Sequence, residues 1–408
     1  MKRDVLKQAA EQFGTPCYVY DLDAIVQRVH LLRTLFDNEF QISYAIKANP
    51  NAALMNALNP VIDTFDASSF AEVKRALAAG MPAGRVSFSG PAKRPTEITG
   101  AVDAGLGELV IETLQEARTA SDHARSLGRR QPCLVRLNPL KVPRKFGASM
   151  AGTPSQFGID EEDMETVLPH IAKLDGLELI GFHIYSGTNC LDAEAIADNF
   201  GIFIDIFRKA QDITGIRPSL LIFGSGFGVP YLQDEKELDH DRLRELVLPL
   251  VADLRKDPIF AETRLTLELG RWLVAPFGWL LTRVISAKTS RGSEFRACDA
   301  GFNNHLAACG MMGSVFRRNW RYINLSNPDG IPALYTLVGP LCTTIDRLAV
   351  DVDLAEVRVD DLLAIPQSGA YGLTASPTRF ISHPDPREIV LRQGKATDVS
   401  EALLNHWA

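Results

Sequence analysis

Eight short runs of β-branched and apolar residues recur along the chain, and segments with helical periodicity separate them. This alternation is typical of parallel strands that are joined by crossover helices. Eight strand–helix units over about 250 residues match the size and strand count of a closed (β/α)8 TIM barrel, and the alternative is a doubly wound open sheet. The predicted fold class is therefore α/β with a TIM barrel. The runs begin at Gln41, Val61, Arg85, Glu108, Cys133, Leu179, Leu220 and Arg264.

A second, β-rich domain is expected after about Pro276, where strand-like runs alternate with turn signals and helical periodicity becomes sparse. The early segment CYVYD from Cys17 could add a strand to that domain, and the residues before it are predicted to form an amphipathic helix. We therefore expect the barrel over 22–275. The β-rich domain, a sandwich or a small barrel, is expected over 1–21 and 276–408.

Composition and charge argue against several classes of protein. The formal net charge of -7 is spread along the 408 residues without a block of Lys and Arg, so no nucleic-acid partner is expected. The six cysteines are scattered and form no CxxC pair, which suggests neither a zinc site nor a disulfide framework. No apolar run reaches membrane-spanning length, and the N-terminal segment does not resemble a signal peptide. We expect a cytoplasmic protein without metal, membrane or nucleic-acid partners.

Reactive side chains follow several of the predicted strands. Active sites of TIM barrels lie at the C-terminal ends of the strands, so residues at these positions are candidates for catalysis. Lys47 follows a buried strand in YAIKANPN, where desolvation would lower the pKa of its amine and favour Schiff-base chemistry. Each candidate taken singly has an ordinary structural explanation, such as a surface lysine or a core histidine. The strand-end candidates are Lys47, Asp66, Arg136, His183, Gly224, Ser225, Gly226 and Glu268.

A glycine-rich turn among these candidates suggests a phosphate site. GSGFG alone would more often be a tight turn, and a lone glycine trio is a weak signal. Together with Ser186 and the arginine of ELGR, Arg271, the turn offers backbone N–H groups, a hydroxyl group and a cation to one phosphate. The combination therefore predicts a site for a single phosphate group.

Seven motifs, in order along the chain, resemble those of one enzyme family. YAIKAN resembles its cofactor-lysine motif, FDASSFAEV its second-strand motif, GFHIYSG its ring-stacking histidine motif and GSGFG its phosphate loop. LELGRWLVAP, GPLCTTID and GAYG resemble the remaining three. The chain is similar over essentially its full length to the fold-type III pyridoxal-phosphate decarboxylases, the group of diaminopimelate, ornithine and arginine decarboxylases. The resemblance implies an amino-acid decarboxylase, a carboxy-lyase, with pyridoxal 5′-phosphate as its cofactor.

The resemblance also implies a role for each candidate. Lys47 would bind the cofactor as a Schiff base, Glu268 would keep the pyridine nitrogen protonated and deepen the electron sink, and His183 would lie against the ring face. Asp66 and Arg136 would shape the electrostatics around Lys47. The family commonly has glycine at the middle of the phosphate loop, so the serine there could add a donor or merely be tolerated. The other residues expected to bind the cofactor are Ser186, Gly224, Ser225, Gly226, Gly270, Arg271 and Tyr371.

A head-to-tail homodimer with two shared active sites is a further implication of the resemblance. Cys342 in GPLCTTID corresponds to the cysteine that reaches the partner's site and returns a proton after carbon dioxide leaves. Without the motif, an inert buried cysteine would be the preferred interpretation. Asp346 aligns with an acidic residue near the substrate, and Thr343 and Tyr371 are the other residues expected there.

Departures from the family pattern concern the distal end of the substrate. Diaminopimelate decarboxylases usually have Glu directly after the cysteine, where this chain has Thr343, and an arginine where it has Ala307. A tyrosine–asparagine pair near the C-terminus is replaced by SPTRFISHPDP. The loss of both distal anchors fits an extended substrate, because a buried unpaired charge in the pocket would cost several kcal/mol in binding. Free diaminopimelate is therefore not the expected substrate.

The segments SQFGID, NNHLAACG followed by SVFRRNW, and FISHPDP resemble a specialised-metabolism branch of the family. That branch includes the butirosin-pathway decarboxylase of carrier-bound glutamyl groups, exosortase-associated homologues and siderophore-pathway decarboxylases of citryl-amino acids. It implies a small amino-acid conjugate or an acyl-carrier-protein-tethered amino acid as substrate. The stretch 139–160, interpreted as a long loop and candidate lid, could line a wide entrance with NNHLAACG. Arg317 and Arg318 could meet a carboxylate or a carrier phosphate, although a solvated charge pair is slightly preferred.

Three alternatives stay open. One is the diaminopimelate decarboxylase of lysine biosynthesis. The second is a racemase of related fold, against which Glu268 argues because such racemases have an arginine there and a weaker electron sink. The third is a non-catalytic homologue that binds a partner protein. Such a homologue would be expected to have lost the lysine or the cysteine, whereas Lys47 and Cys342 are both present.

Overall fold

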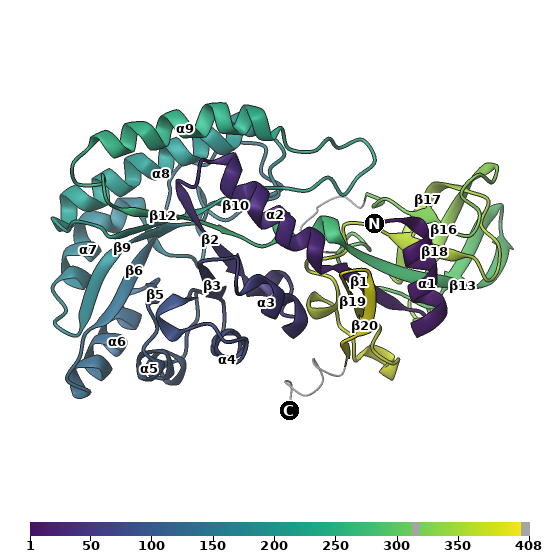
Figure 1. Cartoon of the computed structure of the whole chain (residues 1–408), viewed down its shortest axis with the longest axis horizontal. Coiled ribbons are helices and arrows are strands. Elements are labelled where there is room, and N and C mark those ends of the chain that lie inside the picture. The colour runs from purple at the N-terminus through teal and green to yellow at the C-terminus, as the bar shows by residue number, and fades with distance from the viewer. Residues whose placement is uncertain (312–317, 401–408) are drawn as a thin grey trace.

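The computed structural model describes residues 1–311 and 318–400 of the chain. Within these residues, eight parallel strands follow one another in the order β5-β4-β3-β2-β12-β11-β9-β6, and the pairing of β6 with β5 closes the ring (Figure 1). The predicted TIM barrel is confirmed, and the closure excludes an open sheet. The barrel strands are β2 (Phe40–Ala45), β3 (Thr64–Ala67), β4 (Val86–Phe88), β5 (Glu108–Ile111), β6 (Gln131–Asn138), β9 (Leu177–Ile184), β11 (Leu220–Gly224) and β12 (Arg264–Leu269).

Helices surround the barrel, and two of them begin shortly after a strand with a side-chain cap (Figure 1). At the start of α4, the Ser69 side chain accepts a hydrogen bond from the backbone N–H of Glu72, whose carboxylate accepts from the backbone N–H of Ser68. At the start of α6, the Thr113 side chain accepts from the N–H of Glu116, whose carboxylate accepts from the N–H of Glu112. These caps fix the points at which β3 and β5 give way to loops at the C-terminal end of the barrel. The helices are α2 (Leu22–Leu35), α3 (Ala52–Leu58), α4 (Phe70–Ala78), α5 (Pro95–Ala104), α6 (Leu114–Ser126), α7 (Met164–Ala172), α8 (Ala193–Thr214), α9 (His240–Lys256) and the short α10 (Arg271–Val274).

The 139–160 stretch is mostly irregular and carries two short strands. The strand β7 (Ala148–Ser149) pairs with β10 (Gly187–Thr188), next to the end of β9. The strand β8 (Ile159–Asp160) pairs with Leu137 and Asn138 at the C-terminal end of β6. Both pairings hold the loop against the C-terminal ends of the barrel strands.

A second sheet lies beside the barrel and joins the start of the chain to its last third (Figure 1). Its strand β1 pairs antiparallel with β13 and parallel with β19, so the early CYVYD segment belongs to this sheet, as predicted. The predicted N-terminal helix, α1 (Arg3–Phe13), buries Leu6 against Leu281 and Ile389 of the sheet. We propose the two sheets as the cores of the two expected domains. The strands are β1 (Cys17–Asp21), β13 (Gly278–Ser290), β14 (Ser293–Cys298), β15 (Ile323–Asn324), β16 (Pro332–Val338), β17 (Arg347–Ala355), β18 (Leu362–Ile365), β19 (Arg387–Arg392) and β20 (Lys395–Asp398).

Across the part of the chain that the structure describes, no helix has the length and apolar character needed to cross a membrane.

Part of the barrel interior is polar. Ser43, Thr64 and Thr266 are buried on barrel strands, and their hydroxyl groups have no hydrogen-bond partner among the described residues. Atom Oε2 of the buried Glu108 also lacks a partner there. Burial raises the pKa of Glu108 to about 7, while the charge of Arg264 opposes the rise. A carboxyl group inside the barrel therefore keeps its proton at mildly acidic pH.

We expect Glu108→Gln to remove a pH-dependent loss of stability. Because the pKa of Glu108 is raised from 4.5 to about 7 by folding, the folded protein keeps a proton that the unfolded chain releases, and stability falls as the pH rises through this range. Glutamine has nearly the same shape and does not titrate. The variant should match the wild type near about pH 5 and exceed its free energy of unfolding near about pH 8 by up to about 3 kcal/mol. Urea unfolding at the two pH values checks this, and an equal difference at both would contradict it.

Candidate active site

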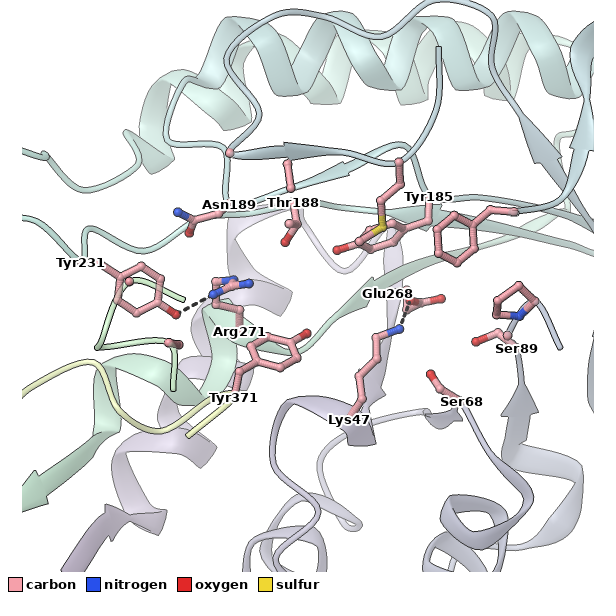
Figure 2. Close-up of a pocket in the computed structure, with 18 of the residues that line it drawn as sticks. Lys47, Ser68, Ser89, Tyr185, Thr188, Asn189, Tyr231, Glu268, Arg271 and Tyr371 are labelled. Carbon is pink, nitrogen blue, oxygen red and sulfur yellow. Dashed lines mark hydrogen bonds and ion pairs between the residues drawn. The ribbon is translucent and has the colours of Figure 1, made fainter. Parts of the chain in front are cut away.

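A cavity of about 650 Å³ lies at the C-terminal ends of the barrel strands. Figure 2 shows that Lys47 and Glu268 point toward one another within it, and that Tyr371 lies between Lys47 and Arg271. Tyr371 comes from the last third of the chain, and its backbone N–H donates to the carbonyl of Ala48 at 2.8 Å. Both halves of the chain therefore build the site. Of the candidate residues, Lys47, Arg136, His183, Glu268, Arg271 and Tyr371 line the cavity.

Lys47 lies in the 3-10 turn η1 (Ile46–Ala48), which directly follows β2. Its Nζ atom is 3.8 Å from Asp66 Oδ2 and 3.9 Å from Glu268 Oε1. Burial by itself lowers the pKa of this amine, but the two carboxylates outweigh burial and raise the pKa above its ordinary value. The expectation of a lowered pKa is therefore wrong, because β3 and β12 bring two negative charges to the amine. Lys47 must lose a proton before it can act as a nucleophile.

Glu268 and His183 form a buried hydrogen-bonded pair in the barrel mouth. His183 Nε2 lies 2.8 Å from Glu268 Oε2. Burial alone would raise the pKa of Glu268, but the hydrogen bond with His183 and the positive charges around the carboxylate lower it to about 2. Glu268 is therefore a fixed anion over the ordinary pH range, suited to pairing with a protonated ring nitrogen. His183 Nδ1 is buried and has no hydrogen-bond partner in the described part of the chain.

Asp66 faces the same lysine in a different electrostatic environment. Ser89 Oγ donates to Asp66 Oδ1 at 2.8 Å, whereas Oδ2 has no hydrogen-bond partner among residues 1–311 and 318–400. Burial and the charge of Glu268 raise the pKa of Asp66, and Lys47 only partly offsets them. The site therefore contains one firmly ionised carboxylate and one that takes up a proton readily, as expected where two buried carboxylates lie near one amine.

Arg136 is fixed by a carboxylate that the sequence interpretation omitted. Its Nη1 atom donates to Glu112 Oε1 at 3.1 Å, and the Glu112 carboxylate also accepts from the backbone N–H groups of Gly90 and Gly158. The guanidinium group lies over the ring of Phe157, 4.4 Å from its centroid. Glu112 ends the predicted run ELVIE, so the strand-end rule that selected Asp66 would have selected it as well.

A narrow recess beside Lys47 has the features of a phosphate site. It is lined by Gly226, Gly270, Arg271 and Tyr371, among others. Gly226 has φ +64°, and a Cβ atom there would lie 2.6 Å from the carbonyl oxygen of Gly187, so only glycine allows this close backbone approach. The guanidinium group of Arg271 donates from Nη1 to the Tyr231 hydroxyl group at 2.7 Å, and its buried Nε has no partner among the described residues. The recess thus combines a glycine turn with a cation that has a donor to spare.

Pyridoxal phosphate fits this set of groups. The Lys47 amine suits its aldehyde, the ionised Glu268 suits its ring nitrogen, and the recess at Gly226 and Arg271 suits its phosphate. The unpartnered Arg271 Nε offers one further donor.

Two predicted hydroxyl donors make other hydrogen bonds. Ser225 Oγ donates to the backbone carbonyl of Glu268 at 3.1 Å, which favours the interpretation that this serine is tolerated for its structural contact. Ser186 Oγ donates to Asn199 Oδ1 at 2.8 Å. Neither Ser186 nor Gly224 is among the described residues that line the cavity or the recess. Their role at the cofactor stays a prediction.

The GPLCTTID segment does not line the cavity of its own chain, as far as the described residues show. Cys342 is exposed, and its thiol is free. The carboxylate of Asp346 accepts from the backbone N–H groups of Phe302 and Leu341, each at 2.8 Å, so it holds the turn that presents the cysteine. The roles of Cys342, Thr343 and Asp346 at an active site stay predictions.

The outer part of the cavity contains an aromatic pair that the sequence did not indicate. The rings of Tyr231 and Trp320 stack with centroids 4.1 Å apart and an interplanar angle of 22°. Both residues line the cavity, as do Ala307 and Arg318. Arg317 lies outside the described residues. Ala307 therefore places a small apolar side chain in the cavity wall.

Comparisons with known proteins agree with this arrangement. Residues 22–275 match the family model described as pyridoxal-dependent decarboxylase, pyridoxal binding domain. The chain is 33% identical over 388 residues to the L-glutamyl-[BtrI acyl-carrier protein] decarboxylase of Niallia circulans, covering 94% of this chain and 90% of that protein. It is 26% identical over 401 residues to the 2-[(L-alanin-3-ylcarbamoyl)methyl]-2-hydroxybutanedioate decarboxylase of Staphylococcus aureus, covering 96% and 98% of the two chains. The crystal structure of diaminopimelate decarboxylase from Helicobacter pylori complexed with L-lysine matches with a TM-score of 0.85 and 27% identity over 98% of each chain.

Proposed function

The chain belongs to the family of pyridoxal-dependent decarboxylases, and from this premise we propose that it removes the α-carboxyl group of an amino acid that is extended or tethered at its distal end. It is a carboxy-lyase with pyridoxal phosphate as its cofactor. When bound, the cofactor supplies a conjugated ring that accepts the electron pair left by departing carbon dioxide.

We assign the residues around the cofactor as follows. Lys47 would hold the aldehyde carbon. Asp66, 3.8 Å from the Lys47 amine, takes up or returns the proton that this amine must exchange, since burial raises the pKa of the Asp66 carboxyl group. Glu268 keeps the ring nitrogen protonated, because its own pKa of about 2 leaves it an anion. His183 orients Glu268 through their hydrogen bond and supports the ring. Arg136 is held in place by its buried ion pair with Glu112.

The recess beside Lys47 would hold the phosphate, with Gly226 and Gly270 in its wall and Arg271 balancing the charge. Arg271 is itself positioned by the Tyr231 hydroxyl group and by the face of Tyr371, whose ring centroid lies 4.7 Å from the guanidinium carbon. Residues from both halves of the chain would therefore bind the phosphate group.

A second copy of the chain completes each site. Cys342 is exposed on the β-rich half of the chain, while Lys47 lies in the barrel mouth. Exposed apolar side chains occur on the same half, with Ile331 84%, Leu334 59% and Ile345 54% accessible, and Ile345 lies three residues after Cys342. Such side chains favour burial against a partner. In the proposed head-to-tail homodimer, Cys342 enters the partner's cavity and delivers a proton to Cα after carbon dioxide leaves.

The observation that carries the substrate proposal is Ala307 in the wall of a cavity of about 650 Å³. A free diamino diacid would leave its distal carboxylate without a cation at this wall, and Thr343 offers no carboxylate for its distal amine. The relatives from Niallia circulans and Staphylococcus aureus act, as their names state, on a carrier-linked glutamyl group and on an alanine conjugate. We propose the same class of substrate here, handled in the cytoplasm, where the six cysteines stay reduced.

We expect free diaminopimelate to be a poor substrate. Losing a paired contact to a charged group costs about 2–5 kcal/mol, which corresponds to well over tenfold in affinity. Carbon dioxide release should therefore show a kcat/KM for a carrier-linked glutamyl group or a citryl-type conjugate at least about tenfold above that for free diaminopimelate, lysine or ornithine. A higher kcat/KM on free diaminopimelate would contradict the substrate proposal. It would favour the alternative of a diaminopimelate decarboxylase, the enzyme in the Helicobacter pylori structure.

Restoring the two distal anchors should create the missing specificity. The double variant Ala307→Arg/Thr343→Glu should raise kcat/KM on free diaminopimelate by about tenfold or more and lower it on the extended substrate. Thr344→Glu is the matched control, because it adds the same charge at the exposed neighbouring position. The substrate proposal would be contradicted if Thr344→Glu alone gave the same gain.

A further inference from the structure

A second cavity borders the first one at its outer edge. This groove, of about 450 Å³, is lined by Leu232, Gln233, Asp234, Arg318, Asn319 and Val350. Leu232 and Arg318 line the active-site cavity as well. A substrate that extends from the Lys47 site past Ala307 would therefore reach the groove by passing Leu232 and Arg318.

Hydrogen bonds and a stacked ring pair hold the border between the two cavities in place. Arg321 donates from Nε to the carbonyl of Leu232 at 3.0 Å and from Nη2 to the carbonyl of Glu235 at 3.1 Å. Its backbone N–H donates to the carbonyl of Tyr231 at 3.2 Å. The stacking of Trp320 on Tyr231 adds an apolar contact to the same junction. The loop after β11 is thus held against residues 318–321. These contacts fix the backbone that carries Leu232 and Arg318.

Arg318 is the cation at this edge. Its Nη2 atom contacts both carboxylate oxygens of Asp234, at 2.8 Å and 2.7 Å. Its Nε and Nη1 atoms make no hydrogen bond to another described residue, and the side chain is 53% exposed. An arginine held on one side by a carboxylate keeps donors for a second anion. Asp234 therefore orients the guanidinium group without using all of its donors.

The floor of the groove is polar and fixed. Asn319 Nδ2 donates to the carbonyl of Val350 at 2.6 Å, and the N–H of Val350 donates back to Asn319 Oδ1 at 2.9 Å. Gln233 is exposed and adds an amide group to the lining of the groove. Four of the six lining residues are polar or charged and one of these is a cation, so the groove suits a hydrogen-bonding chain that carries a negative group.

On the basis of the function proposed above, we propose that this groove binds the distal part of the extended substrate and that Arg318 pairs with an anionic group on that extension. Two sources have this chemistry. One is the phosphate of a pantetheine tether on a carrier protein, and the other is a carboxylate of a citryl-type conjugate. The arms of the experiment separate them.

The test measures binding of product analogues to the holoenzyme by calorimetry, because a probe that has already lost its α-carboxyl group binds without turnover. One pair of probes is the decarboxylated glutamyl group on phosphopantetheine and on pantetheine without phosphate. A second pair is the decarboxylated citryl-type conjugate and its neutral ester. Arg318→Ala should weaken the anionic probe of one pair by about tenfold and leave its neutral counterpart unchanged. The pair that responds identifies the source of the anion.

Two further variants make the test specific. Gln233→Trp places a bulky ring in the groove at an exposed position and should weaken both probes of the responding pair. Arg208→Ala is the matched control, since Arg208 forms a comparably exposed ion pair with Asp253 on the outer helices and should change neither probe.

The proposal is overturned if the wild type does not distinguish the anionic from the neutral probe in either pair. It is also overturned if Arg318→Ala keeps the preference or if Gln233→Trp binds every probe as the wild type does. A failure of the proposed function would look different, since the wild type would then release no carbon dioxide from any extended substrate even though the binding preference was present.

Discussion

Replacing Lys47 with alanine should abolish decarboxylation and covalent retention of the cofactor. Lys47 Nζ is the amine that lies between the Asp66 and Glu268 carboxylates in the barrel mouth, and the recess for a phosphate adjoins it. Removing a nucleophile at such a position lowers kcat by roughly 10³-fold or more. The purified wild type should show visible cofactor absorbance, and borohydride reduction followed by peptide mapping should place the pyridoxyl label on Lys47.

Matched variants separate the chemical role of Lys47 from its charge. Lys47→Arg keeps a cation beside the two buried carboxylates and should restore stability without restoring activity. Lys145→Ala removes an exposed lysine that is paired with Asp192 on the loop near the cavity, and it should retain activity and label. Label on another lysine while Lys47 is unmodified would show that the assignment of the amine is wrong.

Mixing two inactive proteins should restore activity if the site is shared between chains. Lys47→Ala and Cys342→Ala each remove one group from every site of their own homodimers. A mixed dimer contains one site with both groups intact, so random refolding of an equal mixture should give about one quarter of the wild-type activity per subunit. Activity and the fraction of mixed dimers, followed by a size tag on one variant, are the measurements.

The control for the mixed dimers carries both substitutions in one chain. Refolding the Lys47→Ala/Cys342→Ala chain with the wild type tests whether dimers form and exchange, because a mixed dimer of these two chains has no intact site under the shared-site model. If mixed dimers of the two single variants form and no activity returns, Cys342 does not act in the partner's site.

The barrel was predictable because its strands are short runs of mainly apolar residues, a pattern that is typical of parallel strands buried on both faces. Each of the eight predicted runs overlaps a barrel strand, but the limits of several strands differ from those expected. The run from Val61 becomes strand only at Thr64. Just before it, the Asp63 backbone N–H donates to the carbonyl of Ile42, while its carboxylate accepts from the N–H of Ile42 and from Arg33. A side-chain contact of this kind has no signature in local periodicity.

The β-rich half was harder to predict in detail. Its sheet was expected, but β14, β15 and β20 were not identified as strands. Residues of β14 and β20 are largely half-exposed or exposed, and β15 has only two residues, so none shows a strong apolar alternation. The strands β14 and β20 pair with the strands that directly precede them, β13 and β19, so backbone pairing specifies them more than an apolar pattern of their own.

The site shows the same division between local and long-range information. Strand-end positions and motif resemblance both selected Lys47, His183 and Glu268, which the structure places together around one cavity. The pKa of Lys47 was predicted in the wrong direction, because its sign depends on carboxylates that arrive from two other strands. The Tyr231–Trp320 stack was not anticipated, because each residue sits in an irregular segment and they meet only when the barrel loop docks on the β-rich half.

The mass of the product formed in deuterated water tests the central claim most directly. Holoenzyme would be incubated in D2O with an L-glutamyl group linked to a carrier protein or to phosphopantetheine, and the released amine would be analysed by mass spectrometry. Decarboxylation with proton return predicts a product that has lost the mass of carbon dioxide and gained a single deuterium at Cα. A substrate that keeps its carboxyl group while exchanging deuterium at Cα would show racemase-type chemistry. That result would contradict the assignment of this site as a decarboxylase.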